Sequence, residues 1–149
     1  MKQPITQTTE NGIDDQWTLF FDAACTKELA GAGVVIISPS KQTTHLAYKL
    51  NFKVTNNIAE YEALLLGLNA AKDMGIKNLQ VYGDDDLIIQ QVNKSFKAKH
   101  VRLQAYRDEV LTVIKSFVKF KLNHVPRARN ELADSLVVSA CAFIPPLPP

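Results

Sequence analysis

The sequence predicts an α/β domain built on one mixed five-stranded sheet with helices on both faces. Three strand-like segments come first and are spaced for an antiparallel meander,. An apolar stretch with helical periodicity follows, and later segments complete the order β-β-β-α-β-α-α-β-α,. Right-handed crossovers through those helices would lay the fourth and fifth strands parallel to the first.

The length of 149 residues, with 46% hydrophobic and 21% charged residues, suits one globular domain with a substantial core,. We expect a flexible lead-in over residues 1–15, the domain over 16–142 and a proline-rich tail over 143–149,. No apolar run would span a membrane, and the polar start lacks the apolar core of a signal peptide,. Two cysteines far apart give no disulfide framework,. An intracellular monomer, cytoplasmic or nuclear and without membrane contact, is therefore expected.

The first three predicted strands form the meander. Residues 17–22 are rich in aromatic and branched side chains, as in a strand buried on both faces, and they end in Asp22,. A second strand over 32–38 closes in a turn that contains Pro39, and a third follows over 43–50,. An acid therefore stands at the carboxyl end of the first strand.

The central helix of the prediction spans about residues 55–73. Its N-terminus is capped by Thr55, Asn56 or Asn57, and Gly75 is a natural left-handed terminator at its other end,. The helix is apolar enough to pack on the sheet.

Glu60 lies on the core-facing stripe of this helix. At about 100° per residue it shares the stripe with Leu64, Gly67 and Ala71, whereas Glu62 falls on the polar side,. A carboxylate on a buried stripe is costly unless something pairs with it. Glu60 is therefore either a structural acid bonded to an amide or an arginine, or part of a functional cluster, and acids at the ends of other elements favour the cluster.

The second half of the chain again alternates strands and helices. A strand over 79–82 is followed by Gly83 and three aspartates, Asp84 to Asp86, before a helix over 87–92,. Helix capping explains one of these three acids. The remaining elements are a basic loop over 93–102, a helix over 103–116, a strand over 117–125, a loop over 126–129 and a last helix over 131–142 with Asn130 as its cap.

Charge is unevenly distributed along the chain. The net charge is +2, but residues 94–129 carry ten basic and two acidic side chains, and the remainder carries seven basic and thirteen acidic ones. A charge run is usually a solvated face. Here, however, a basic region lies beside acidic residues at the ends of helices and strands. This arrangement suits an enzyme that binds a polyanion with its basic region and cleaves it with metal ions held by its acidic residues.

Four acids are candidates for one metal site. Asp22 and Asp84 end neighbouring strands, so they meet at one edge of the sheet, and Glu60 can point at the same spot,. Asp134, in the first turns of the last helix, supplies a fourth acid. Carboxylates this close repel one another without cations, and oxygen ligands suit Mg²⁺ or Mn²⁺. Two such ions about 3.5–4 Å apart activate water and stabilise the leaving oxygen in phosphodiester cleavage.

Four motifs resemble those of the type 1 ribonuclease H domain, most closely the version in gypsy-class retroelement polyproteins and its plant and archaeal relatives. They are FFDAAC from Phe20, TNNIAEYEAL from Thr55, VYGDDDLII from Val81 and HVPRARNELADSL from His124. The resemblance covers about residues 17–142. It implies a ribonuclease H-like fold of strand order 3-2-1-4-5, two Mg²⁺ ions with Mn²⁺ as a substitute, and endonucleolytic cleavage of the RNA strand of an RNA–DNA hybrid to 5′-phosphate and 3′-hydroxyl ends.

The resemblance also implies roles for particular residues. The catalytic, metal-binding acids would be, by motif match, Asp22, Glu60, Asp84 and Asp134. The two asparagines that open the central helix would meet sugar and backbone in the minor groove, where the 2′-hydroxyl distinguishes RNA from DNA. A reverse transcriptase domain upstream in a polyprotein is a candidate partner. The full set implied in nucleic-acid contact is Ala23, Ala24, Asn56, Asn57, Lys97, Lys99, Arg102 and Asn130.

Departures from the family pattern leave a second function open. Ala23 stands where the family usually has glycine, and its methyl group would crowd a closely approaching RNA backbone,. Asp85 stands where serine is usual and adds negative charge beside the metals. The alternative to the nuclease is therefore a catalytically weakened module that binds hybrid, although all four acids are present. A proofreading exonuclease would instead need a glutamate at Ala24.

Overall fold

The computed structural model describes residues 15–25, 30–50, 55–93 and 101–135. The predicted proline-rich tail and nearly all of the predicted lead-in lie outside these residues. Among the helices that are described, none is long and apolar enough to cross a membrane.

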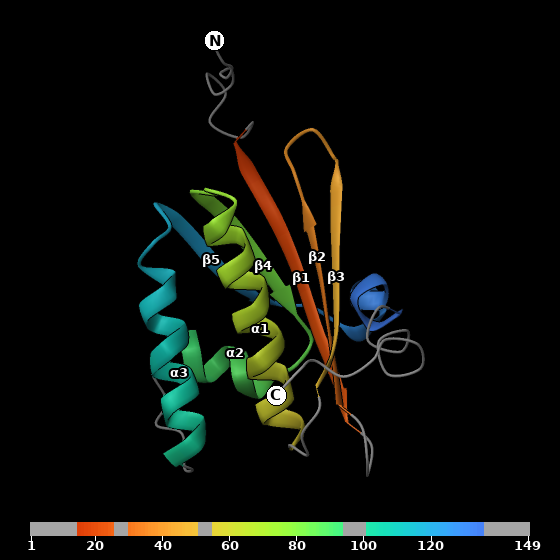
Figure 1. The fold of residues 1–149 in the computed structure, drawn as a ribbon, viewed down its shortest axis with the longest axis vertical. Coiled ribbons are helices and arrows are strands. Elements are labelled where there is room, and N and C mark those ends of the chain that lie inside the picture. Colours follow the sequence, from red (N-terminus) through yellow and green to blue (C-terminus); the bar gives the residue numbers. More distant parts are fainter. Residues whose placement is uncertain (1–14, 26–29, 51–54, 94–100, 136–149) are drawn as a thin grey trace.

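One five-stranded sheet forms the centre of the fold (Figure 1). Its strands are β1 (Gln16–Cys25), β2 (Ala30–Ile37), β3 (Thr43–Leu50), β4 (Asn78–Gly83) and β5 (Lys119–His124). The order β3-β2-β1-β4-β5 confirms the predicted topology. β1 runs antiparallel to β2 and parallel to β4, β3 runs antiparallel to β2, and β5 runs parallel to β4. β1 is therefore the central strand, with a partner on each side.

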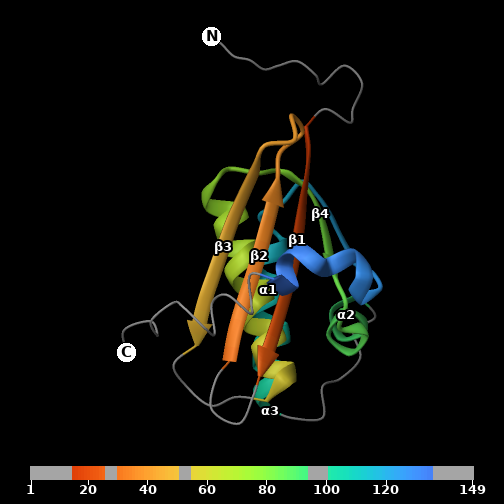
Figure 2. The ribbon, with the colours of Figure 1, turned by 90° about the vertical axis from the view of Figure 1, so that its right-hand side faces the viewer.

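Helices cover both faces of the sheet, as predicted. On one face lie α1 (Asn56–Asp73) and α3 (Val101–Ile114), while the short α2 (Asp86–Asn93) packs against β5 and α3. The opposite face is crossed by a 3-10 turn, η2 (Arg127–Asn130), which continues as helix through residue 135 (Figure 2). The remainder of the predicted last helix, to residue 142, lies outside the described residues.

The core lies between α1 and the sheet. Leu19 and Phe21 of β1 are fully buried. α1 packs tightly on Leu19 at Gly67, where an added Cβ would lie 3.0 Å from a methyl carbon of Leu19. The stripe predicted for Glu60 is confirmed, since Leu64 and Gly67 are buried with it. α1 therefore presents Glu60 toward the sheet.

Both ends of α1 follow from local chemistry. Of the three candidate caps, Thr55 is the N-cap, and its hydroxyl accepts a hydrogen bond from the Ile58 amide at 3.3 Å,. Gly75 has a φ of 78°, the left-handed conformation predicted for the residue that ends the helix,.

Other boundaries differ from the prediction. β1 runs beyond Asp22 to Cys25, because β2 continues to pair with it that far. α3 begins at Val101, inside the predicted basic loop. The predicted loop before the last helix is instead η2, closed by a hydrogen bond from the Arg129 amide to the Pro126 carbonyl at 2.9 Å.

Candidate active site

Asp22 and Asp84 come from the two parallel strands at the centre of the sheet. β1 and β4 are in a register that places Phe20 opposite Tyr82, so each acid follows that pair by two residues. A Cβ at position 83 would lie 2.5 Å from the Phe21 ring, so only glycine lets β4 end so close to β1. The structure thus brings the two acids to one edge of the sheet.

Glu60 reaches the same edge from α1. Its side chain is 7% exposed. Carboxylate oxygens of Asp22, Glu60 and Asp84 lie within 4.8 Å of one another, close enough for a cation to bridge them. Asp134 is not part of this closest group, but it borders the same cavity and its charge acts on Asp22.

Two buried oxygens of the acid cluster lack a hydrogen-bond partner. Among the described residues, Asp22 Oδ1 and Glu60 Oε1 are buried with no partner. Burial, and then the charge of Asp84, raises the pKa of Asp22 from 3.8 to about 7. Burial, and then the charges of Asp22 and Asp85, raises the pKa of Glu60 from 4.5 to about 9. Such a site takes up protons or cations, and carboxylate oxygens fit Mg²⁺ or Mn²⁺.

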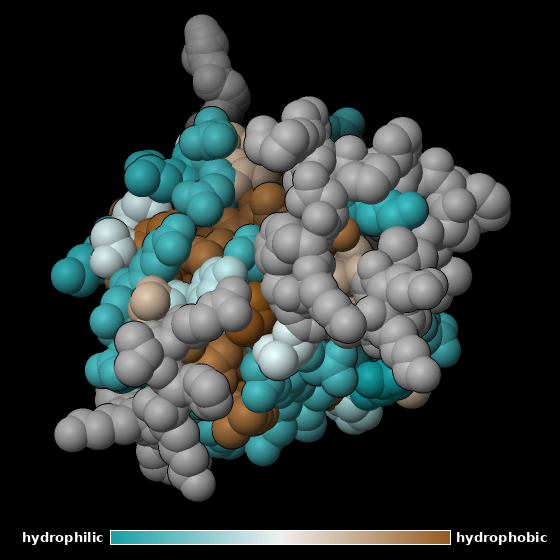
Figure 3. All heavy atoms as spheres, turned by 60° about the horizontal axis from the view of Figure 1, so that its bottom comes forward, coloured by the Kyte–Doolittle hydropathy of each residue, from teal (hydrophilic) through white to brown (hydrophobic). Residues whose placement is uncertain are grey.

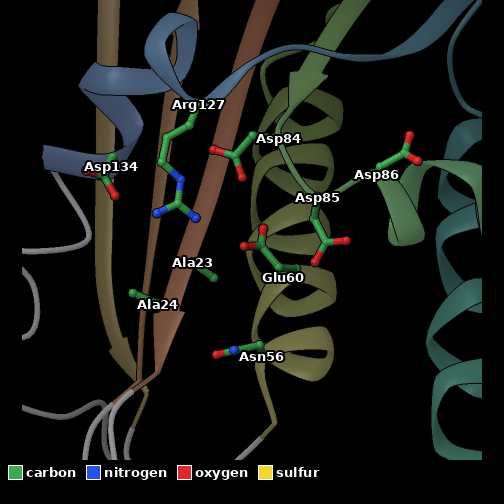
Figure 4. A pocket seen from close by; sticks show the side chains of 9 residues that line it. All are labelled: Ala23, Ala24, Asn56, Glu60, Asp84, Asp85, Asp86, Arg127 and Asp134. Atoms are coloured by element: carbon green, nitrogen blue, oxygen red, sulfur yellow. The ribbon is translucent and has the colours of Figure 1, made fainter.

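A cavity of about 430 Å³ opens over the acids (Figure 4). Its walls come from β1, α1, the link between β4 and α2, and the segment from η2 to residue 135. Figure 4 shows the carboxylates of Glu60, Asp84 and Asp85 near one another. The lining residues are Ala23, Ala24, Asn56, Glu60, Asp84, Asp85, Asp86, Arg127 and Asp134.

Asp85 is the acid that caps α2. Its Oδ1 accepts a hydrogen bond from the Ile88 amide at 3.2 Å, and its carbonyl accepts one from the Ile89 amide at 3.3 Å. Burial raises the pKa of Asp85, and the backbone hydrogen bonds from Ile88 and Leu87 oppose that shift. Asp85 therefore stabilises the helix and faces the cavity; Asp86 borders the cavity too, but its side chain is exposed.

Asn130 lies beneath the site. Its side chain is 1% exposed, and its Nδ2 donates to the Phe21 carbonyl at 2.8 Å and to Asp84 Oδ2 at 3.1 Å. Asn130 thus holds Asp84 in place from the interior, and its burial leaves no surface for the nucleic-acid contact implied by the motif. Nor does it cap the last helix, because the helical segment already begins at Arg127.

Three of the residues implied in nucleic-acid contact line the cavity. Ala23 and Ala24 of β1 line it, as does Asn56, which is exposed at the start of α1. Asn57 is half-buried in the same turn and is not among the lining residues.

Positive charge at the cavity comes from Arg127. Figure 4 shows its guanidinium group pointing between Asp134 and Asp84. No sequence signal distinguishes this arginine from its basic neighbours, although it lies in the same motif as Asp134. The basic residues implied instead were Lys97, Lys99 and Arg102; the two lysines and the Arg102 side chain lie outside the described residues.

The fold and the acid cluster define a class of protein, an α/β domain of ribonuclease H-like topology with a site suited to divalent cations. A family model described as Reverse transcriptase-like matches residues 20–140. The crystal structure of RNase H1 from Halobacterium salinarum is 30% identical with a TM-score of 0.76, covering 84% of this chain and 96% of that one. The chain belongs to the reverse transcriptase-like family as a type 1 ribonuclease H domain.

This chain is also similar to two curated proteins and to a second solved structure. Ribonuclease HI of H. salinarum is 35% identical over 88 residues, 59% of this chain and 44% of the relative. A bifunctional protein of Mycobacterium tuberculosis is 32% identical over 112 residues, 74% of this chain and 31% of the relative. The chain therefore spans less than half the length of these curated relatives. The solved complex of LC11-RNase H1 with an RNA/DNA hybrid is 27% identical with a TM-score of 0.76, covering 84% of this chain and 96% of that one.

Proposed function

We propose that this protein is a ribonuclease H, which hydrolyses the RNA strand of RNA–DNA hybrids internally to leave 5′-phosphate and 3′-hydroxyl ends. The observation that carries the proposal is the cluster of Asp22, Glu60 and Asp84, whose oxygens lie within 4.8 Å of one another under an open cavity. The substrate is supported by a relative of similar fold, LC11-RNase H1, which was solved in complex with an RNA/DNA hybrid.

The proposed site uses two Mg²⁺ ions, with Mn²⁺ as a substitute, held by Asp22, Glu60, Asp84 and Asp134. Bound there, the ions supply an activated water and stabilise the leaving oxygen. The chain itself keeps the ligands in place: β1 carries Asp22, α1 carries Glu60, and Asp84 directly follows β4, where Asn130 holds its carboxylate. Ligands on rigid, buried elements keep their geometry before metal arrives.

The proposed substrate contacts surround the cavity. Asn56 offers its amide to sugar and backbone, and the Arg127 guanidinium offers paired donors for a phosphate,. Lys97, Lys99 and Arg102 are proposed to add phosphate contacts along the hybrid. We also propose that the domain acts as a monomer, with a reverse transcriptase domain of a longer protein as a candidate partner.

Cleavage of a labelled hybrid tests the proposal. The protein should cut the RNA strand in Mg²⁺ or Mn²⁺, and EDTA should stop the reaction, because carboxylates alone cannot activate water at a phosphate. Single-stranded RNA and duplex DNA of the same sequence are the controls. Binding of hybrid without cleavage in either metal would identify the chain as the hybrid-binding module instead.

Asp85→Ser should lower the KM for hybrid with little change in kcat. Serine can still cap α2, so the variant mainly removes a negative charge that faces incoming phosphates,. We expect a fall in KM of about two- to fivefold at low salt and less at high salt, where the repulsion is screened. Steady-state kinetics at two salt concentrations measure this.

Asp86→Ser is the matched control for this prediction. It removes the same charge one residue away, from an exposed side chain. An equal fall in KM for both variants would show that net charge is responsible, and an unchanged KM for Asp85→Ser would show that this aspartate does not oppose substrate.

A further inference from the structure

Two hydrogen bonds, one buried and one partly buried, join three helices next to the acid cluster. Tyr61 of α1 and Gln91 of α2 are 0% and 5% exposed. The Tyr61 hydroxyl donates to Gln91 Oε1 at 2.7 Å, and Arg107 Nε of α3 donates to the Gln91 carbonyl at 2.8 Å. α2 is thereby tied to α1 through a side chain and to α3 through its backbone.

These hydrogen bonds connect the helix that carries Glu60 to the helix that follows Asp84 in the chain. Tyr61 follows Glu60 directly in α1. Gln91 belongs to α2, and the N-terminal cap of that helix, Asp85, follows Asp84. The Tyr61–Gln91 hydrogen bond therefore joins α1, which carries Glu60, to α2, the helix that begins two residues after Asp84.

The hydroxyl is the part of Tyr61 that apolar packing does not explain. Phenylalanine would fill nearly the same volume and keep the stack on the Tyr106 ring, whose centroid lies 5.8 Å away. A buried hydroxyl or amide that loses its partner is costly. The Tyr61–Gln91 hydrogen bond thus favours one position of α2 relative to α1, whereas apolar contacts alone would tolerate small shifts.

We propose that Tyr61 and Gln91 are positioning residues of the metal site, because their hydrogen bond sets the separation of Glu60 from Asp84. Arg107 supports them by holding the backbone of Gln91. The proposal rests on the proposed function in one respect, namely that the acids bind a divalent cation. It adds that the affinity for that cation depends on two residues that do not touch it.

The test is the binding of Mg²⁺ alone, without substrate, by titration calorimetry and by the rise in melting temperature that Mg²⁺ produces. In Tyr61→Phe the dissociation constant for Mg²⁺ should rise about fivefold, the effect of one lost hydrogen bond. The Mg²⁺ concentration for half-maximal cleavage should rise by the same factor, while kcat at saturating Mg²⁺ stays within about twofold.

Gln91→Leu removes the acceptor and should weaken Mg²⁺ binding in the same way. The double variant should bind Mg²⁺ no more weakly than the weaker single variant, because both changes break one interaction. Each substitution keeps the approximate volume of the side chain, and circular dichroism of the variants verifies that the fold is retained.

Tyr106→Phe is the matched control. The Tyr106 hydroxyl donates to Glu62, so the variant loses a hydrogen bond between α1 and α3 without altering the link to α2. Its Mg²⁺ affinity should equal that of the parent. Equal weakening in Tyr106→Phe and Tyr61→Phe, or none in Tyr61→Phe, would overturn the proposal. A parent that binds Mg²⁺ but leaves hybrid uncut would instead reject the proposed function and leave this inference standing.

Discussion

Glu60→Gln should abolish hybrid cleavage while leaving hybrid binding measurable. Glutamine keeps the shape of the side chain but removes the charge from the member of the cluster that α1 contributes. We expect the single-turnover rate to fall by about three orders of magnitude or more, roughly 4 kcal/mol of barrier. The affinity for hybrid, measured without metal, should change little, because phosphate contacts come from other residues.

Glu62→Gln is the control for this loss. It makes the same chemical change two residues further along α1, on the half-buried side that bonds to Tyr106, and a glutamine oxygen can still accept that hydrogen bond. Its rate should match that of the parent. A Glu60→Gln variant that still cleaved at the parent's rate would remove Glu60 from the site.

The metal-free protein should lose stability as the pH rises from about 4.5 to about 9. In that window the buried Glu60 keeps its proton, because burial raises its pKa from 4.5 to about 9, whereas the same group in the unfolded chain is ionised,. The folded state therefore binds more protons, so rising pH favours unfolding. Asp22 contributes in the same direction between 3.8 and about 7. We expect a loss of several kcal/mol, measured by denaturant unfolding in EDTA at a series of pH values.

Two comparisons isolate the cause of this pH dependence. Glu60→Gln should flatten the curve and melt higher than the parent in EDTA at pH 8, since the glutamine does not ionise in the unfolded chain. Saturating Mg²⁺ should remove much of the loss, because the cation takes the place of the protons. A parent whose metal-free stability rises steadily with pH would contradict the clustered, buried acids.

Much of the fold could be predicted because its signals are local. Alternation and a turn define β3 to the residue, and the Thr55 cap and Gly75 bound α1. The parallel pairing of β1 with β4 follows from the handedness of crossovers, and it brings Asp22 and Asp84 together,. Helical periodicity alone turns Glu60 toward them.

The parts of the site that escaped prediction depend on contacts between distant segments. Asn130 has the sequence features of a helix cap, yet its amide is buried against the Phe21 carbonyl, 109 residues away. The bond between Tyr61 and Gln91 joins helices whose packing no local pattern reports. Arg127 is one of several basic residues in its region, and only the tertiary fold turns it toward the acids.

The central position of β1 in the sheet should determine the order in which parts of the domain unfold. Because β1 is hydrogen-bonded to β2 and β4, its amides should exchange with solvent only through global unfolding, while the amides of the edge strands β3 and β5 exchange through smaller fluctuations,. Figure 3 shows apolar residues gathered near the middle of the lower face, between polar ones. Asp22 lies on β1, Glu60 lies on α1, which packs on β1, and Asp84 directly follows β4, which pairs with β1. Fraying at the edges therefore leaves the three carboxylates together, and catalysis should survive mild urea until the whole domain unfolds.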